Sequence, residues 1–285
     1  MTRRRFPVGK TLLYVFMSLW ALTTIYPFIW VILNSFKPRG LIRSDTFSLP
    51  IGDKFTLENY VTAFKRVDIG TAYVNSIVIS GAVTVVVMVL AGLAAYAMVR
   101  YSFRLRGFLH SMIIASMMFP VFSTIIPVFR MESSWGIVNT GSIWLTRLSV
   151  VLPQIAGNLS FAIIVLMGFI RSLPVDLEEA AYLEGYNVYQ IFFRIIMPLA
   201  KPSFATVGIF TFLWSYNDIF LQMFFLRSKK FFTITRLLNE ISSQAGTNYG
   251  LMVAAVVMVV IPVLVVYIFL QNYIIKGMTA GAVKG

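Results

Sequence analysis

Long apolar runs alternate with shorter polar segments along most of the chain. A transmembrane helix needs about 20 consecutive, mostly apolar residues. Six runs reach that length, and we expect a helix in each: 12–34, 71–98, 108–129, 148–170, 203–226 and 251–274. The pattern therefore predicts an all-α integral membrane protein with six transmembrane helices, because a helix in lipid pairs its backbone polar groups within itself.

The first apolar run follows Arg3, Arg4 and Arg5, as the apolar part of a secretory signal peptide would. The run is too long for a signal peptide, and no small-residue cleavage site follows it, so we interpret it as an uncleaved first helix. If the N-terminus lies in the cytoplasm, the basic residues divide evenly between the two sides of the membrane. The positive-inside rule gives most weight to the first helix and to short basic loops. The arginine triplet and the loop 100–106 therefore place both termini and the loop 171–202 in the cytoplasm.

Two longer polar segments fall on the outer side in this topology. Segment 35–70 mixes proline, glycine, threonine and charged residues, and we expect irregular chain with a short helix. Segment 227–250 is expected to form a short amphipathic helix near 235–243. These boundaries predict a single transmembrane domain over 1–285. Its parts are a first helix with an external segment over 1–70, a core domain over 71–275 and a tail over 276–285.

The composition supports a membrane protein and argues against a soluble one. The chain is 58% hydrophobic, its mean hydropathy is +0.81, and 12% of its residues are charged, whereas a soluble domain carries about 25%. The net charge of +13 would suggest nucleic-acid binding in a soluble protein. Here the basic residues lie mostly at span ends and in loops, so we expect contact with membrane lipid and no nucleic-acid partner.

Residues that could carry chemistry are few. The chain has no cysteine, which excludes disulfides and thiolate metal sites. Gly9, Lys10 and Thr11 resemble the end of a P-loop, but Arg4 stands at the position of its first glycine and no strand precedes it. The single histidine, His110, has no nearby carboxylates with which to form a metal site or a catalytic triad. We therefore predict that the protein is not an enzyme and has no catalytic, cofactor-binding or metal-binding residues.

The loop 171–202 is the most distinctive polar segment. Asp176 can cap a helix, and Glu179, three residues later, completes a capping-box pattern. Gly185 can adopt the left-handed conformation that ends such a helix. Asn187 can cap a second helix, which must break at Pro198. We predict two short helices on the membrane surface, with glutamates that point to water or to cations of a partner, although an ordinary amphipathic connector has similar features.

The loop resembles the cytoplasmic "EAA" loop of ABC importer permeases. The family pattern E-A-A-x3-G-x9-I-x-L-P is matched, except that methionine replaces leucine, by Glu179, Ala180, Ala181, Gly185, Ile195, Met197 and Pro198. That replacement conserves volume. The C-terminal segment 269–285 is similar to the tail of the smaller, maltose-type permease of carbohydrate ABC importers. Shorter similarities lie at 35–38, 57–60, 75–76 and 93–97.

The resemblance implies the type I ABC importer permease fold and a multi-pass protein of a bacterial or archaeal cytoplasmic membrane. It also implies import of a sugar or oligosaccharide delivered by an extracellular solute-binding protein. The other expected partners are a second permease subunit and two cytosolic ATPase subunits, which would hold ATP and Mg²⁺. The implied contacts with the ATPase are Glu178, Glu179, Ala180, Ala181, Gly185, Ile195, Met197 and Pro198 in the loop, and Thr279, Gly281 and Lys284 in the tail.

Asp218 is the one acidic residue well inside a predicted span, and such residues usually face a bundle interior or a water-filled cavity. Relatives often have Trp-Asn-Glu-Phe where this chain has Tyr-Asn-Asp-Ile. The candidate pathway or substrate residues are Asn75, Tyr216, Asn217 and Asp218. The alternative role for them is hydrogen bonding between helices, with sugar contacts made by the partner permease.

Two alternative functions stay open at this point. One is an ABC importer permease for another polar solute. The other is an ion-coupled secondary transporter, which would require more intramembrane charge than the chain contains.

Overall fold

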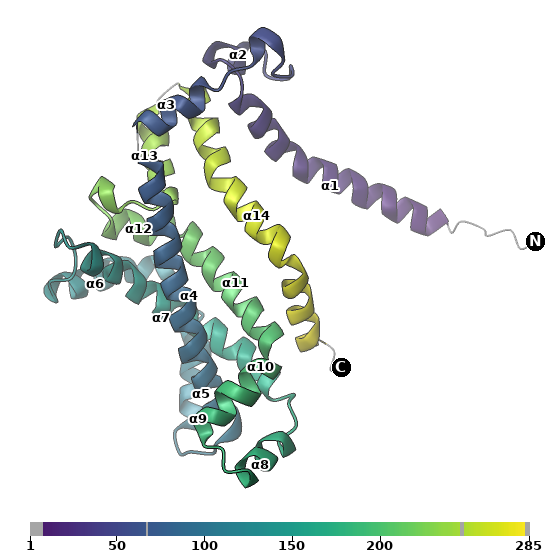
Figure 1. Ribbon diagram of the computed structural model, residues 1–285, viewed down its shortest axis with the longest axis vertical. Coiled ribbons are helices and arrows are strands. Elements are labelled where there is room, and N and C mark those ends of the chain that lie inside the picture. The colour runs from purple at the N-terminus through teal and green to yellow at the C-terminus, as the bar shows by residue number, and fades with distance from the viewer. Residues whose placement is uncertain (1–7, 67, 246–247, 283–285) are drawn as a thin grey trace, which may run out of the picture. The chain divides into compact units, whose positions relative to one another are not determined.

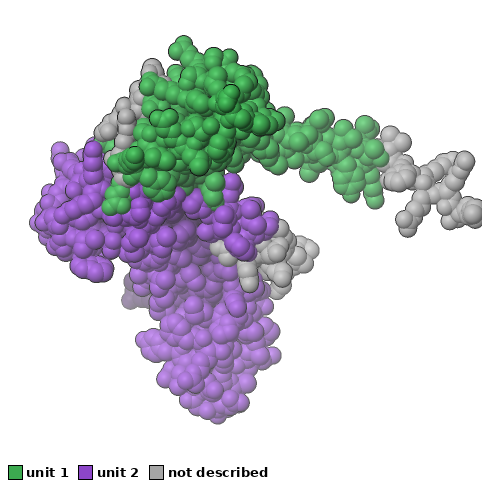
Figure 2. Space-filling view, turned by 45° about the horizontal axis from the view of Figure 1, so that its top comes forward, with its two compact units in different colours: residues 1–68, 238–261 green, residues 69–237, 262–285 purple. Residues whose placement is uncertain are grey.

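The computed structural model describes residues 8–66, 68–245 and 248–282 (Figure 1). Every regular element in these ranges is a helix. The helices form two compact units, one of residues 1–68 and 238–261, the other of residues 69–237 and 262–285 (Figure 2). The long helix α14 (Tyr249–Ala282) contributes its first part to unit 1 and the rest to unit 2.

Four helices are long and apolar enough to cross a membrane: α1 (Val8–Ser35), α4 (Ile69–Arg100), α7 (Ile143–Ile170) and α14. A fifth crossing results if Val188–Leu199 and Lys201–Asn217, which meet at 83°, count as one span. The prediction of an all-α integral membrane protein is confirmed. Two of the six predicted spans, however, are not continuous helices.

The predicted span 108–129 is wrong as a single helix. The chain forms α5 (Arg106–Ser116) and α6 (Val121–Ser134), separated by four residues. Pro120 lies at the break with extended backbone angles, φ −66° and ψ 122°. Proline has no N–H to continue the hydrogen bonds of α5, and it disfavours helical geometry in the residue before it.

The predicted span 203–226 is also divided. α11 (Lys201–Asn217) ends before Asp218, and α12 (Ile219–Phe225) begins after it. Asp218 has φ −70° and ψ 97°, and its carboxylate accepts a hydrogen bond from the N–H of Leu221 at 3.1 Å. The break follows from the side chain, because aspartate is a strong N-cap and a poor residue for a helix interior.

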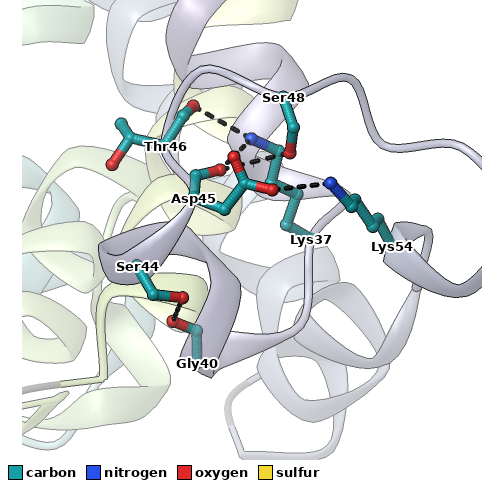
Figure 3. Close-up of polar contacts among 7 residues, drawn as sticks. All are labelled: Lys37, Gly40, Ser44, Asp45, Thr46, Ser48 and Lys54. Atoms are coloured by element: carbon teal, nitrogen blue, oxygen red, sulfur yellow. Dashed lines mark hydrogen bonds and ion pairs between the residues drawn. The ribbon is translucent and has the colours of Figure 1, made fainter.

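Unit 1 contains the segment predicted to be external. After α1 come α2 (Arg39–Ser44), the 3-10 turn η1 (Gly52–Lys54) and α3 (Glu58–Arg66). Lys37 is fully buried, and its Nζ donates to the carbonyls of Asp45 and Thr46, both at 2.9 Å (Figure 3). Burial lowers the pKa of Lys37. Nζ of Lys54 lies 2.6 Å from Oδ2 of Asp45, and the hydrogen bond that it donates lowers the pKa of the Asp45 carboxyl. The segment is thus held by buried bonds to its backbone.

Replacing Lys37 with methionine is expected to loosen this external segment. The change keeps the length of the side chain but removes both hydrogen bonds that Nζ donates, so the carbonyl of Thr46 loses this donor and the carbonyl of Asp45 keeps the hydroxyl of Ser48. An unsatisfied buried carbonyl costs about 1–3 kcal/mol. Limited chymotrypsin digestion of the purified protein should cut faster near Phe47, which is 81% exposed. Lys54→Met removes only a solvent-exposed ion pair and is the matched control. Equal cutting rates in the two variants would contradict the role of Lys37.

The core of unit 2 is formed by α4, α7 and α11, with α4 packed against both of the others. Its inward face repeats at helical spacing through Ile79, Val83, Val87, Ala91 and Ala95, all at most 1% exposed. The predicted amphipathic helix is present as α13 (Ile234–Ala245), after the 3-10 turn η3 (Lys229–Phe231). The loop 171–202 lies at the end of α4 that carries Arg100 (Figure 1).

Candidate functional site

The first half of the loop forms α8 (Asp176–Leu183). The sequence predicted Asp176 as the cap of this helix. Asp176 is instead its first residue, because Val175 already has helical angles (φ −71°, ψ −28°). Three acidic residues, Asp176, Glu178 and Glu179, occupy the first turn. Their charge there is favourable, because the N–H groups of a helix start are unpaired and partly positive.

Gly185 ends this helix as predicted, with φ +87°. The N–H of Gly185 bonds to the carbonyl of Tyr182, and that of Tyr186 to the carbonyl of Ala181, both at 3.0 Å. This pair of bonds is a Schellman motif, which requires the left-handed conformation that glycine adopts without strain. The turn between the two halves of the loop is therefore specified locally.

The second half of the loop begins with the predicted cap. Asn187 and Gln190 form a reciprocal capping box, at 2.8 and 2.9 Å. The helix continues as α9 (Val188–Ile191), the π-helical turn η2 (Phe192–Ile196) and α10 (Met197–Leu199). The break predicted at Pro198 occurs instead at Ala200, because the wider π turn accommodates a residue that lacks an N–H.

The predicted coupling residues do not share one environment. Glu179, Ala180, Gly185 and Pro198 are exposed, Ile195 and Met197 are half-buried, and Ala181 is buried. Sequence reasoning missed Leu183, whose side chain is 91% exposed at the end of α8. The sequence shows a leucine two residues before Gly185, but its exposure is evident only from the structure. Three of the exposed residues of α8, Glu179, Ala180 and Leu183, are called its outer face.

Glu178 differs from its neighbours because it points inward. The expectation that the loop glutamates point to water or to cations of a partner is therefore wrong for this residue. Its side chain is buried, accepting from Nε of Arg100 at 2.5 Å and from the hydroxyl of Tyr96 at 2.7 Å. Arg100 also donates to the carbonyl of Leu173 at 3.0 Å. The glutamate turns inward because the end of α4 supplies a cation, which a buried carboxylate requires.

In the tail, α14 continues through Ala282. Thr279 and Gly281 lie within this helix. The tail contains no proline, so a helix can continue through it although Gly277 and Gly281 are poor helix formers. Lys284 lies outside the described residues.

Asp218 borders a cavity of about 240 Å³ in unit 2. Its Oδ2 accepts from Nε2 of Gln154 at 3.0 Å, and Oε1 of Gln154 accepts from Ser215 at 2.6 Å. A second cavity, of about 450 Å³, shares lining residues with the first, and cavities of about 300–1,000 Å³ commonly hold small molecules. The residues that line the first cavity include Phe122, Gln154, Asn158, Trp214, Ser215, Asp218 and Phe220.

The other candidate pathway residues lie elsewhere. Asn75 donates to the carbonyls of Lys230 and Phe232, at 3.2 and 3.0 Å, and accepts from Arg147 at 2.9 Å, so it fixes η3 against α4. Tyr216 is buried, and Asn217 is exposed with its amide bonded to its own helix. Neither lines the cavity beside Asp218.

Sequence reasoning did not include Gln154, Asn158 and Trp214 among the site residues. Gln154 and Asn158 stand four residues apart in α7, which puts them on one face, but no local signal links them to α11. Oδ1 of Asn158 is buried and has no hydrogen-bond partner within the part of the chain that the structure describes. The cavity is therefore lined by a carboxylate, two amide side chains and an aromatic face.

Comparison with known proteins places the chain in a family. Residues 88–280 match the family described as binding-protein-dependent transport system inner membrane component. The chain is 33% identical over 273 residues to the diacetylchitobiose uptake system permease protein NgcG of Streptomyces coelicolor, covering 95% of this chain and 88% of that protein. It is 31% identical over 260 residues to the melibiose/raffinose/stachyose import permease protein MelC of Bacillus subtilis, covering 91% of each.

The fold is similar to that of a solved transporter. One chain of a bacterial ABC transporter involved in import of the acidic polysaccharide alginate superposes with a TM-score of 0.80, at 24% identity, over 96% of this chain and 99% of that chain. The resemblance found in the sequence is thereby confirmed. This chain belongs to the family of binding-protein-dependent transport system inner membrane components, the multi-pass permeases of ABC importers.

Proposed function

We propose that this permease imports a sugar or oligosaccharide that an extracellular binding protein delivers. The observation that carries the proposal is the similarity, over more than 90% of the chain, to permeases named for uptake of diacetylchitobiose and of melibiose, raffinose and stachyose. The cavity beside Asp218 supports it, because Trp214 offers an aromatic face and Gln154, Asn158 and Asp218 offer hydrogen-bonding groups. A ligand with many hydroxyls and apolar ring faces suits such a lining.

The topology that we propose has six crossings with both termini in the cytoplasm. α1, α4, α7 and α14 cross as single helices, α5 and α6 together form a third crossing, and α11 with α12 forms the fifth. Breaks such as those at Pro120 and Asp218 are tolerated at membrane depth where they are buried in protein or line a cavity. The parts 1–70, 71–275 and 276–285 keep their proposed roles as external and first-helix part, permease core and tail.

The outer face of α8 is the proposed docking site for a cytosolic ATPase. Leu183 supplies an apolar contact, Ala180 permits close approach, and Glu179 can pair with a cation of the partner. Two ATPase subunits that bind ATP and Mg²⁺, together with a second permease, complete the proposed assembly. Thr279, Gly281 and Lys284 are proposed to contact the ATPase as well.

Reconstitution of the whole importer tests this function. In proteoliposomes, the permease alone should hydrolyse no ATP, and sugar uptake should require the second permease, the ATPase, ATP and the loaded binding protein. A panel of sugars, amino acids and peptides identifies the cargo class. Uptake of amino acids or peptides only would overturn the sugar assignment, and uptake driven by an ion gradient without the ATPase would favour a secondary transporter.

A further inference from the structure

We propose that one stripe of α4, formed by Gly92, Tyr96 and Arg100, receives the movement of the coupling loop and passes it to the transmembrane core. Glu178 is the positioning residue that joins the loop to this stripe. The inference rests on the proposed role of α8 in docking the ATPase. It adds the route by which a push on α8 reaches the spans.

The stripe faces the loop along two turns of helix. Gly92, Tyr96 and Arg100 are spaced four residues apart, so they lie on the same side of α4. At the end of the stripe, Arg100 and Tyr96 both bond to the buried carboxylate of Glu178, at 2.5 and 2.7 Å. The hydroxyls of Tyr101 and Tyr182 add a contact between α4's end and α8 that is exposed, at 3.0 Å.

Tyr96 contacts both halves of the loop. Its hydroxyl bonds to Glu178 in α8, and its ring centroid lies 5.7 Å from that of Phe192 in η2. One turn earlier, a Cβ at Gly92 would come within 2.9 Å of the ring of Phe192. The missing side chain at Gly92 therefore makes room on α4 both for the π-helical turn and for Phe204 of α11, whose ring a Cβ would meet at 2.8 Å.

The segment that connects α7 to α8 also bonds to this stripe of α4. The connection 171–175 contains Pro174, and Arg100 donates to the carbonyl of Leu173 within it. Moving α8 away from α4 would break the Arg100–Glu178 ion pair and the hydrogen bonds that Tyr96 and Arg100 make to Glu178 and Leu173. Hydrogen bonds to charged groups are the stronger ones in proteins. α8 and α4 should therefore move as one body.

Movement of α4 would reach the rest of unit 2 through its packing. Beyond the stripe, α4 packs along α7 and α11, and its residues Val83, Val87 and Ala91 are fully buried there. Close-packed interiors deform little, so a displacement at one end of α4 is transmitted through the packed helices.

The test compares transport with ATP hydrolysis in the complete importer in proteoliposomes. Glu178→Gln keeps the shape of the side chain and removes its charge, and Arg100→Gln removes the guanidinium and leaves a shorter, neutral polar side chain. We expect complexes that assemble and hydrolyse ATP within about 2-fold of the wild-type rate, with at least 10-fold less sugar imported per ATP hydrolysed. The double variant should be no worse than either single variant, since both remove one link. Arg100→Lys should recover part of the coupling.

Controls separate this role from simple stabilisation. Tyr182→Phe removes the exposed hydroxyl contact at the same loop, and Glu184→Gln removes an exposed charge from it, so both should leave the ratio of sugar to ATP unchanged. If Glu178→Gln prevents assembly, Tyr96→Phe keeps the ring packing and loses only the hydroxyl, and should lower the ratio about 3-fold. Assembled variants with lower thermal stability but an unchanged ratio would overturn the proposal. A wild-type importer without ATP-dependent sugar uptake would instead overturn the proposed function.

Discussion

Replacing Leu183 with arginine is expected to separate the permease from its ATPase. The side chain is 91% exposed at the end of α8, although no neighbouring part of the described chain requires an apolar residue there. Burying a leucine on docking contributes about 1.5–3 kcal/mol, and an unpaired charge in the same place adds a desolvation cost. We therefore expect the affinity for the ATPase subunit to fall by roughly 100-fold or more, which corresponds to about 2.7 kcal/mol.

Arginine is chosen because it should preserve the helix. A cation in the last turn of α8 is favourable to the partial negative charge at a helix C-terminus. The dissociation constant can be measured by titrating fluorescently labelled ATPase into the permease in detergent, and the helix is checked by circular dichroism. Leu183→Met keeps volume and hydrophobicity and should bind normally.

A second control addresses the side of the membrane. Phe47 is 81% exposed in the segment proposed to be external, so Phe47→Arg makes a comparable change on the other side of the membrane in the proposed topology. Its affinity for the ATPase should equal that of the wild type. If Leu183→Arg bound the ATPase as tightly as Phe47→Arg does, α8 would not be the docking element.

The loop shows which features of the site a sequence can specify. The predictions of the turn at Gly185 and of the capping box of Asn187 and Gln190 are correct because their partners lie within five residues. The inward direction of Glu178 was not predictable in this way. Its partner Arg100 stands 78 residues earlier, and only the packing of α8 on α4 brings the two together.

The two interrupted spans were also not predictable from the number of apolar residues. Counting apolar residues finds segments long enough to cross a membrane, but it gives no weight to a single residue that prefers to start a new helix. Pro120 and Asp218 are such residues, and each begins a helix inside a predicted span. The helix break in the fifth predicted span places the carboxylate of Asp218 beside Gln154. Among the predicted pathway residues, Asp218 is therefore the best one to test by substitution.

Replacing Asp218 with asparagine is expected to reduce sugar transport strongly while preserving the fold. Asparagine caps helices as well as aspartate does, so α12 should still begin at its present residue. Oδ1 must continue to accept from Leu221, which turns the new NH₂ group toward Nε2 of Gln154, where two donors would meet. Gln154 cannot simply rotate, because its Oε1 already accepts from Ser215.

The size of the effect follows from the lost charge. A hydrogen bond to an ionised group contributes about 1.5–3 kcal/mol, so loss of one such bond to a sugar hydroxyl lowers transport by roughly 10- to 150-fold. Uptake of radiolabelled sugar by the complete importer measures this directly. The affinity of the binding protein for the sugar should not change, because the substitution is in the permease.

Asn217→Ala is the matched control, because Asn217 is the adjacent residue, is exposed and bonds only within α11 among the contacts described. Trp214→Ala should lower uptake as Asp218→Asn does, since the aromatic face and the carboxylate line the same cavity. Normal uptake in both cavity variants, with a lower melting temperature in Asp218→Asn alone, would show that the network of Asp218 and Gln154 only joins helices. Reduced uptake with unchanged stability in both cavity variants, together with normal uptake in Asn217→Ala, would place the cavity on the path of the sugar.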